Sequence, residues 1–457
     1  MDVDWDKVQS EVLLHGSPGY ELARKPAAPL LPDLRPMAVV RCASAGEVAE
    51  VIGLARRHGL ACAPRSGGHC FAGRSSTGGI VIDVSPMRSV SVVGQVVTVG
   101  AGARLGEIYA ALAEHGLTVP AGCGPTVGIA GLTLGGGLGI LGRSRGLTSD
   151  NLLAATVVLA DGRIVDCDER HDPDLFWALR GAGGGQFGVV TSLTFRAAAA
   201  PPATSFHLTW RPADAAKVIG AWQDWAPAGP DELAASLLVT VDGDVEWPPV
   251  VTVFGAMLDT ESATAGLLGE FAALAGVEPL SVSTRYLPFH ETKRYLAGTG
   301  PGVESPGYTF SKSGYFNRRL PSEAVSALVD HLVGARVPGQ ARELDFTPWG
   351  GAYNRVPVDA TAFAHRDAMF LLKQSAAVDV DAPAGERDAA RGWLVRSHAL
   401  VHAWGTGGVY PNFPDRELAD WPRAYHGANY ARLRRVKARY DPDGFFRFHQ
   451  AIPPADR

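Results

Sequence analysis

Glycine-rich segments between residues 65 and 188 constrain this chain more than any other feature of its sequence. Four of them stand out: RSGGH at 65–69, GCGPTVG at 122–128, GLTLGGGLG at 131–139 and RGAGGGQFG at 180–188. Because glycine has no side chain, its backbone can approach a partner closely and present bare N–H groups to a phosphate. Several such loops in one domain predict an extended cofactor whose pyrophosphate is bound without lysine side chains.

The composition is that of a folded protein without a disulfide framework. Of 457 residues, 46% are hydrophobic, and the net charge of −5 gives no electrostatic reason to bind nucleic acid or an anionic membrane. All five cysteines precede residue 170 and form no CxxC pair, so we expect no metal site. No signal peptide or membrane-spanning run is visible. We therefore expect a cytoplasmic protein, either a monomer or a weak homodimer.

Two kinds of pattern follow one another along the chain. From about residue 34 to 195, short strands alternate with helices, among them residues 44–58, where Ser44 and Glu47 form a capping box. The run AAAAPPA at 197–203 predicts a linker. Beyond it, apolar strand-like runs alternate with long helical patterns, which predicts a mixed sheet with helices on one face. The expected fold class is α+β.

Several short motifs suggest other functions, but their surroundings do not fit. G-x-G-x-x-G at 183–188 follows a helix and precedes a strand, the reverse of a dinucleotide-binding turn. The glycines at 100–106 do lie between strand and helix, but no carboxylate ends a following strand. G-x-S-x-G at 142–146 lacks the buried strand that a nucleophile elbow needs. His398 and His402 have zinc-ligand spacing without the glutamate of H-E-x-x-H, so we interpret them as core or rim histidines.

Longer segments resemble one known family. They are RSGGHCFAG, AGCGPTVGIAGLTLGGGLG, GLTSDNL, DLFWALRGAGGGQFGVVT and, near the C-terminus, GGVYPNFPD and WPRAYHGANYARLRRVKARYDPDGFF. These segments resemble the berberine-bridge-enzyme-like, FAD-linked oxidases. The first domain resembles the PCMH-type FAD-binding module of the vanillyl-alcohol-oxidase superfamily. The resemblance covers about residues 32–453.

The resemblance implies the domain organisation. An N-terminal segment (1–31) would precede an FAD-binding domain of two α/β subdomains (32–200). A substrate-binding domain (201–405), an antiparallel sheet backed by helices, would cover the flavin ring. A C-terminal segment (406–457) would return to the FAD domain.

The same resemblance implies the cofactor site. His69 aligns with the histidine that family members attach covalently to the flavin 8α-methyl group, and Val127 would lie beside the ring, where its small side chain leaves a path for oxygen. Leu132 stands where plant members carry a histidine. The other residues expected to contact FAD are Arg65, Ser66, Gly67, Gly68, Cys123, Gly128, Gly131, Thr133, Gly135, Gly136, Gly139, Asp150, Asn151, Val189, Val190 and Asn412.

Cys123 departs from the family pattern. Members with two flavin links carry the cysteine immediately before the proline, but here Gly124 holds that place. One Cα step is ~3.8 Å, comparable to the reach of a cysteine side chain. We predict one covalent link, through His69, with Cys123 close to the ring but free. The flanking glycines leave a second link, to flavin C6, open.

The catalytic residue is also atypical. Many members carry Tyr-x-Asn-Tyr, whose last tyrosine takes the substrate proton, whereas this chain has Tyr410-Pro-Asn412-Phe413. Phe413 cannot act as a base. Tyr353, Gln374, Tyr410 and His365 are the remaining candidates, and each of them is equally suited to packing. The nearby aromatic residues Trp349, Tyr353, Phe363 and Phe370 would line the substrate site.

The function implied is that of a flavoprotein oxidase. A hydride from a substrate C–H group would pass to FAD, and O2 would reoxidise the flavin and give H2O2. A sugar or a specialised-metabolite alcohol is the expected substrate. A flavin dehydrogenase with another electron acceptor, and a flavin-binding protein with poor turnover, are the alternatives.

Overall fold

The computed structural model describes residues 3–28, 33–299 and 307–456. Its first part contains two sheets. In the first sheet the order is β1-β2-β4-β3, and β2, β4 and β3 are parallel. These strands are β1 (Glu11–Leu14), β2 (Ala38–Arg41), β3 (Cys62–Arg65) and β4 (Ile80–Asp83), and helix α2 (Ala45–His58) connects β2 to β3. The expected N-terminal segment thus supplies a strand, because β1 pairs antiparallel with β2.

Helix α2 begins as the sequence predicts. The Ser44 hydroxyl accepts a hydrogen bond from the backbone N–H of Glu47, and the Glu47 carboxylate accepts one from the N–H of Ala43. These contacts satisfy backbone donors that the first helical turn leaves without partners. Gly59, with φ +63°, ends the helix in the left-handed conformation.

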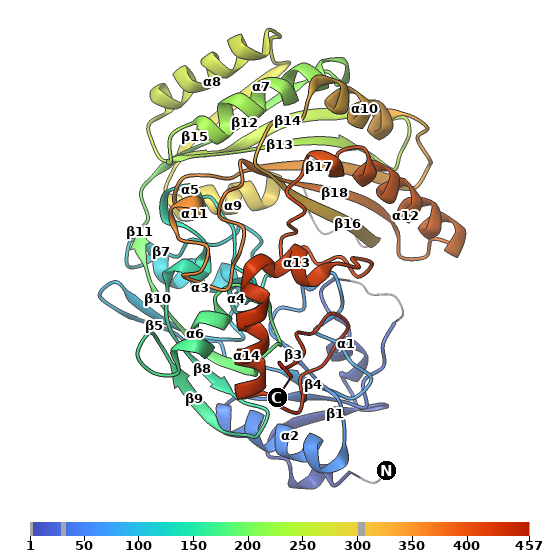
Figure 1. Ribbon diagram of the computed structural model, residues 1–457. Coiled ribbons are helices and arrows are strands. Elements are labelled where there is room, and N and C mark those ends of the chain that lie inside the picture. Colours follow the sequence, from blue (N-terminus) through green and yellow to red (C-terminus); the bar gives the residue numbers. More distant parts are fainter. Residues whose placement is uncertain (1–2, 29–32, 300–306, 457) are drawn as a thin grey trace.

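The second sheet has five antiparallel strands in the order β5-β6-β10-β8-β9. Their bounds are β5 (Val90–Val93), β6 (Val96–Gly100), β8 (Leu152–Val158), β9 (Ile164–Cys167) and β10 (Val189–Arg196). Helices α3 (Leu105–Ala113), α4 (Ile129–Leu134), α5 (Gly142–Arg145) and α6 (Pro173–Leu179) lie between the strands in sequence. Both sheets share one hydrophobic core, so the two subdomains pack as one unit (Figure 1).

The predicted linker at 197–203 is instead structured. Within it, β11 (Ala198–Ala199) pairs with β7 (Leu117–Thr118), and the next strand, β12, begins at Ala203. The small alanine side chains let this segment lie against the FAD-binding part, and the Ala200 N–H donates to Gly116 O at 3.0 Å. The alanine and proline content of this segment predicts a linker and does not reveal that β11 pairs with β7.

The second half of the chain forms a seven-stranded sheet in the order β15-β12-β14-β13-β17-β18-β16. Every neighbouring pair is antiparallel, which confirms the sheet implied by the family resemblance and corrects the mixed sheet expected from the pattern. The strands are β12 (Ala203–Trp210), β13 (Leu233–Val241), β14 (Val250–Met257), β15 (Ser281–Leu287), β16 (Gly307–Phe316), β17 (Gln340–Pro348) and β18 (Phe370–Asp379).

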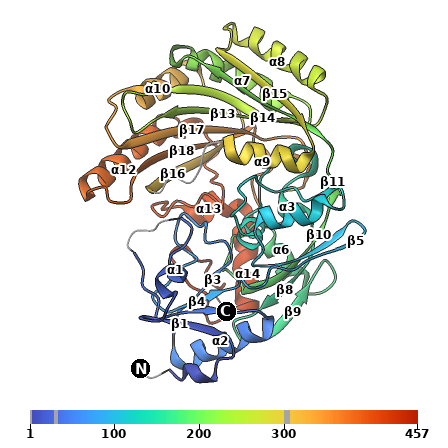
Figure 2. The same cartoon turned by 180° about the vertical axis from the view of Figure 1, so that it is seen from behind.

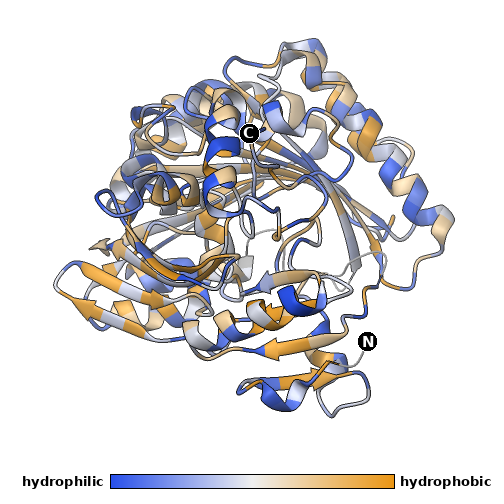
Figure 3. Ribbon diagram, turned by 60° about the horizontal axis from the view of Figure 1, so that its bottom comes forward, coloured by the Kyte–Doolittle hydropathy of each residue, from blue (hydrophilic) through white to orange (hydrophobic). Residues whose placement is uncertain are grey.

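Helices cover the outer face of this sheet, as Figures 1 and 2 show. They are α7 (Ala215–Ala228), α8 (Glu261–Ala275), α10 (Ser322–Val333) and α12 (Ala384–Ala399). Helix α9 (Phe289–Thr299) lies on the inner face, between the sheet and the FAD-binding part. In Figure 3 the strands are mainly hydrophobic, whereas the helices alternate in hydropathy along their length.

The C-terminal segment returns to the first half of the molecule. Helix α14 (Tyr430–Tyr440) packs beside α6, and α13 (Trp421–His426) lies between the two halves (Figure 1). The buried Lys437 amine forms an ion pair with Asp441 at 2.7 Å. The chain therefore crosses between its two halves more than once, and these crossings position the site.

Candidate active site

The loop that carries His69 follows β3 and is held by the two residues before its glycines. Arg65 is 5% exposed, and its guanidinium donates to Ser75 O at 3.0 Å and Ala23 O at 2.7 Å. Ser66 Oγ donates to Ala101 O at 2.6 Å. Both side chains thus bind protein carbonyls and fix the loop, which leaves half-buried His69 at its end.

The His69 loop touches the second subdomain backbone to backbone. A Cβ on Gly67 would lie 2.2 Å from the nitrogen of Gly128, and a Cβ on Gly128 would lie 2.2 Å from Ser66 Oγ. Neither position accepts a side chain unless the loops separate. The Val127 carbonyl accepts from Leu105 N at 3.0 Å, so this contact continues into α3. The structure therefore brings together the predicted residues Ser66, Gly67 and Gly128.

The C-terminal segment holds the loop at 131–139. Asn412 Nδ2 donates to Leu132 O at 2.9 Å and approaches the Tyr410 hydroxyl at 3.1 Å. The Gly137 N–H donates to the same hydroxyl at 3.0 Å. A Cβ on Gly135 would lie 2.1 Å from Asn412 Oδ1. Asn412 and Tyr410 therefore fix the position of this loop through hydrogen bonds to its backbone.

Tyr353 holds the same loop from the second half of the chain. Its hydroxyl donates to Gly139 O and accepts from Gly139 N, both at 3.2 Å, and its ring stacks on Trp349 with centroids 4.3 Å apart. Burial raises the pKa of Tyr353, and it raises that of Tyr410 to about 12. Both phenols are thus engaged and hard to ionise, which disfavours either as a base.

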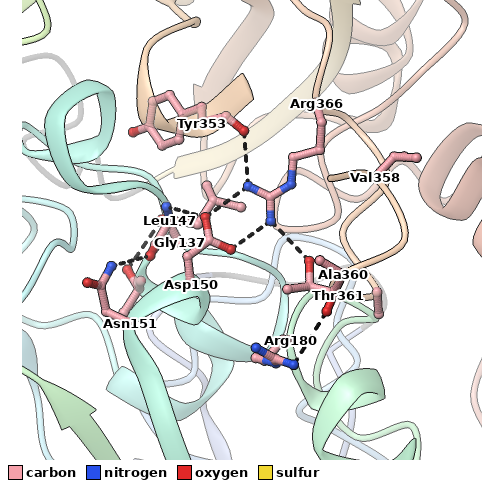
Figure 4. A network of polar contacts seen from close by, with 12 residues as sticks. Gly137, Leu147, Asp150, Asn151, Arg180, Tyr353, Val358, Ala360, Thr361 and Arg366 are labelled. Carbon is pink, nitrogen blue, oxygen red and sulfur yellow. Dashed lines mark hydrogen bonds and ion pairs between the residues drawn. The ribbon is translucent and has the colours of Figure 1, made fainter. Parts of the chain in front are cut away.

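Asp150 and Asn151 make internal contacts (Figure 4). The Asp150 carboxylate receives both terminal nitrogens of Arg366 at 2.7 and 2.8 Å, and the pair is at most 7% exposed. Asn151 Nδ2 donates to Arg145 O and to Leu147 O. Other protein groups therefore already bind both side chains. The expected contacts of Asp150 and Asn151 with the cofactor would have to come from their backbone atoms.

Thr133, Val189 and Val190 are likewise turned to the interior. Thr133 Oγ1 donates to Ile129 O at 2.8 Å within α4. Val189 and Val190 pair with Val158 and Val157 of β8 and are 1% and 4% exposed. Only their backbones are placed to line a ligand site.

Strand alternation decides which side chains face the FAD-binding part. On β18, Leu372 packs in the core beneath the helices, whereas Leu371 packs with Leu147 of the FAD-binding part. Gln374 shares the face of Leu372, because successive side chains alternate. Its register partner Leu344 lies in the same helix-backed core. The structure therefore places Gln374 away from the site, and Lys373 occupies the inner face.

Lys373 joins two carboxylates on that inner face. Its Nζ lies 3.1 Å from Glu343 Oε1 and 3.5 Å from Asp345 Oδ2, and the three side chains are about one-fifth exposed. Burial raises the pKa of Asp345 to about 6, although Lys373 opposes that rise. Burial lowers the pKa of Lys373, but the two carboxylates outweigh burial and raise it. Lys373 thus stays charged, and Asp345 is the group that can exchange a proton near neutral pH.

A chain of contacts leads from this cluster to the His69 loop. Lys373 Nζ lies 5.4 Å from the ring centroid of Phe413, and the Phe413 ring lies 6.4 Å from that of Phe71. Phe71 is two residues beyond His69. The three-residue cluster of Glu343, Asp345 and Lys373 therefore adjoins the position where the tyrosine of the family pattern is replaced by phenylalanine.

The sequence interpretation missed this cluster. Its signal is the alternation in RELDF (342–346), where acidic residues occupy every second position of a strand.

The expected aromatic lining is wrong, because Trp349, Tyr353, Phe363 and Phe370 are at most 2% exposed and pack in the interior. His365 stacks on Tyr315, and burial lowers its pKa to about 4.

The loops leave room for FAD where the glycines have no protein neighbour. A Cβ on Gly131 would meet no atom within 4 Å, and one on Gly184 would meet only Leu134 Cδ1 at 3.9 Å and Gly131 Cα at 4.0 Å. The backbone of Gly131 is thus open on its Cβ side, and Gly184 of the neighbouring loop lies next to it. Such a surface suits an extended dinucleotide with a pyrophosphate.

This fold and site define an FAD-dependent oxidoreductase, and comparison with known proteins identifies its family. Residues 36–168 match the FAD binding domain, and residues 409–453 match the domain described as berberine and berberine like. The chain is 34% identical to the uncharacterized FAD-linked oxidoreductase YgaK of Bacillus subtilis (strain 168), with 99% of this chain and 98% of that protein covered.

Two characterised relatives match nearly as completely. The xylooligosaccharide oxidase of Thermothelomyces thermophilus is 30% identical, with 92% of this chain and 88% of that protein covered. The solved structure of the glucooligosaccharide oxidase from Acremonium strictum, with its 6-S-cysteinyl, 8α-N1-histidyl FAD, has a TM-score of 0.87 at 26% identity. It covers 98% of both chains.

The chain belongs to the berberine-bridge-enzyme-like family of FAD-linked oxidoreductases. Its fold matches that family over the full length, and its FAD-binding domain is established by the match at residues 36–168. No helix among the described residues is long and apolar enough to cross a membrane.

Proposed function

We propose that this protein is an oxidase that acts on a saccharide or a related polyol, with FAD attached covalently through His69 and O2 as electron acceptor. When bound, FAD would supply the two-electron chemistry that accepts the hydride from the substrate C–H group. The chain itself supplies placement of the substrate, removal of a proton and exclusion of water.

The observation that carries the proposal is the polar inner face of the sheet. Glu343, Asp345 and Lys373 form a charged cluster there, and Ser313 and Ser375 lie on the same face in register with it. Charged and hydroxyl groups are suited to hydrogen-bond the hydroxyls of a sugar, and a site built for that purpose discriminates against apolar alcohols. The oligosaccharide oxidases among the relatives support the same substrate class.

Asp345 is the proposed proton acceptor. It takes the proton of the substrate hydroxyl while the adjacent C–H gives up its hydride, so the alcohol becomes a carbonyl. Lys373 stays charged, and its positive charge favours the return of the Asp345 carboxylate to its ionised form after each turnover. A base works best with a pKa near the working pH, and a pKa of about 6 meets that need.

The covalent link is supported by the position of His69 and by the A. strictum enzyme, whose FAD is joined to both a histidine and a cysteine. In this chain Cys123 stands one residue early, so we propose the histidine link alone.

Oxygen consumption tests the proposed function. The purified holoenzyme is incubated with a panel of oligosaccharides and with benzyl alcohol, and O2 uptake and H2O2 are followed together. We expect both only with saccharides. Bleaching of the flavin by a sugar without O2 uptake would favour the dehydrogenase, and no bleaching by any sugar would contradict the substrate class.

Oxygen reactivity has its own test at Val127. This half-buried residue belongs to the loop that meets the His69 loop. Val127→Leu enlarges the side chain, so we expect reoxidation of the reduced enzyme in air-saturated buffer to slow, measured by stopped flow. Equal rates in both proteins would mean that oxygen does not pass this residue.

A further inference from the structure

A lysine from the second half of the chain is buried against the FAD-binding part. Lys293 lies on α9 and is 2% exposed. Its Nζ donates to Ala121 O at 2.6 Å and lies 3.8 and 5.5 Å from the ring centroids of Tyr109 and Phe289. Within the described part of the chain, one neutral carbonyl and two ring faces thus replace the water around this amine. Burial of a cation with so few partners is costly, so the position of Lys293 needs an explanation.

Lys293 belongs to a set of side chains that hold one stretch of backbone. Three consecutive carbonyls, those of residues 120–122, each accept a hydrogen bond from a different element. The donors are Thr148 Oγ1 of η2 (Thr148–Asn151) to Pro120 O at 2.5 Å, Lys293 Nζ of α9 to Ala121 O at 2.6 Å, and the Tyr109 hydroxyl of α3 to Gly122 O at 2.6 Å. All three donor residues are at most 8% exposed, so water does not compete with them.

The N–H groups of the same peptide units point the other way. A trans peptide unit is planar, so the N–H of each residue lies opposite the C=O of the residue before it. The N–H groups of Ala121, Gly122 and Cys123 therefore point away from the side chains that bind those carbonyls. Within residues 3–28, 33–299 and 307–456, none of these three N–H groups donates to a protein acceptor. The three side chains thus fix the direction of backbone donors that the protein itself does not use.

These donors adjoin the glycine-rich segment at 131–139. A Cβ on Gly139 would lie 2.1 Å from Ala121 O, and one on Gly122 would lie 3.5 Å from Leu138 O. The family resemblance assigns both this segment and the one at 122–128 to the cofactor site. FAD is rich in carbonyl and phosphate oxygens, which are the acceptors that backbone N–H groups bind.

We propose that Lys293 is a positioning residue of the cofactor site, which acts with Thr148 and Tyr109 to keep the N–H groups of residues 121–123 turned toward FAD as hydrogen-bond donors. The cost of burying the amine is then explained by the order that it imposes on the cofactor loop from the other half of the chain. This inference depends on FAD binding and not on the substrate or on oxidase activity.

A matched pair of substitutions tests the role of Lys293. Methionine and glutamine side chains have nearly the same length, but only glutamine retains an N–H donor for Ala121 O. Amide hydrogen exchange is followed by mass spectrometry in the holoenzyme, on peptides that cover residues 119–125. We expect slow exchange at 121–123 in the wild type, faster exchange in Lys293→Met and a return toward the wild-type rate in Lys293→Gln.

FAD affinity gives a second readout, which general packing at this position would not restore through a donor. It is measured in the His69→Ala background, where the flavin is expected to exchange. Loss of one hydrogen bond of ordinary net strength corresponds to about a two- to tenfold change in an equilibrium constant, so Lys293→Met should weaken FAD binding by about that factor. Lys293→Gln should recover part of the loss. The exchange measurement in the holoenzyme does not depend on how the flavin is attached.

Two further variants test the same loop without removing a charge. Tyr109→Phe releases Gly122 O and Thr148→Val releases Pro120 O, and each should speed exchange at 121–123 and weaken FAD binding. They decide the question should Lys293→Met fail to fold. Thr264→Val is the control, because buried Thr264 also donates to a carbonyl, that of Thr260 at 2.8 Å, but lies on α8 at the outer face of the sheet. It should leave FAD affinity unchanged.

Three results would overturn the proposal. The first is rapid exchange of the amides at 121–123 in the wild-type holoenzyme, which would mean that they bind no ligand. The second is identical behaviour of Lys293→Met and Lys293→Gln, which would remove the role of the donor. The third is a loss of FAD affinity in Thr264→Val as large as that in Thr148→Val, which would show a general effect of stability.

Discussion

Asp345 lies beside Lys373 and Glu343, where burial raises its pKa to about 6. A base must be deprotonated to act, so kcat/KM should be highest above pH 6 and fall below it as Asp345 takes up a proton. Asp345→Asn should lower kcat by about 10²–10⁴-fold, the usual contribution of a general base. Steady-state kinetics across pH 5–9 measures both effects.

Glu343→Gln is the matched control at this cluster. Glu343 raises the pKa of Asp345, so its neutralisation should shift the acid limb of the pH profile to lower pH while kcat at pH 8 changes little. If Asp345→Asn retains full activity with the same pH profile, the base is another group.

The proposed covalent bond between His69 and FAD can be tested by acid precipitation. We expect the yellow colour to stay with the protein pellet after precipitation of the wild type in trichloroacetic acid, because a covalent bond survives unfolding. His69→Ala should bind FAD only non-covalently and release it into the supernatant. Flavin that remains on the acid-treated variant would mean that Cys123 is bonded to the ring.

Single side chains were the hardest part of the site to predict. The sequence analysis proposed Gln374, but the structure turns Gln374 toward the helix-backed core, and its neighbour Lys373 faces the FAD-binding part. A shift of one residue along a strand moves a side chain to the opposite face. In LLKQS (371–375) polar and hydrophobic residues do not alternate, so the sequence does not show which side chains face the core. In RELDF (342–346) they do alternate, and the two faces of the strand can be told apart.

At the scale of elements, the glycine loops offer a matched pair of substitutions. A Cβ on Gly131 meets no protein atom, so Gly131→Ala should leave stability unchanged or slightly higher while FAD affinity falls. A Cβ on Gly135 meets Asn412 at 2.1 Å, so Gly135→Ala should displace Asn412 and cost about 1–3 kcal/mol of stability. Apoprotein melting and FAD titration distinguish the two.

Gly220 in α7 serves as the control for this pair. Its added Cβ also meets no atom, and the helix lies on the outer face of the sheet, so Gly220→Ala should leave FAD affinity unchanged. Unaltered FAD affinity in Gly131→Ala would mean that this loop does not contact the cofactor.

Helices and strands with strong local signals were predicted well. The helix expected at 44–58, with its Ser44–Glu47 capping box, is α2 in the structure. Strands such as β1 and β15 were missed, because their residues gain order from pairing with a neighbour rather than from their own pattern.

At the scale of the whole molecule, the Asp150–Arg366 pair links the FAD-binding part to the second half of the chain (Figure 4). Both side chains are at most 7% exposed, so removal of one leaves an uncompensated buried charge. Arg366→Met should therefore lower the free energy of unfolding by about 3–5 kcal/mol. Denaturant titration of the holoenzyme measures this loss.

The exposed pair of Arg163 and Asp161 gives the comparison. Its side chains are at least half exposed, and Arg163→Met should cost less than about 1 kcal/mol because water screens the pair. An equally small loss of unfolding free energy in Arg366→Met would show that the Asp150–Arg366 pair does not stabilise the folded protein.

The sequence by itself determined the family, through its long matching segments, and the α+β class, through strand and helix periodicity, because both are expressed locally along the chain. Its glycine-rich segments also predict the loops that contact FAD. It also located the missing phenol at Phe413. Only the tertiary structure decided that Tyr353, Tyr410 and Asn412 hold the loops, and that Glu343, Asp345 and Lys373 meet on one sheet face. Those groups are brought together by strand register and by the return of the C-terminal segment, and contacts between residues so distant in sequence leave no signal in either segment alone.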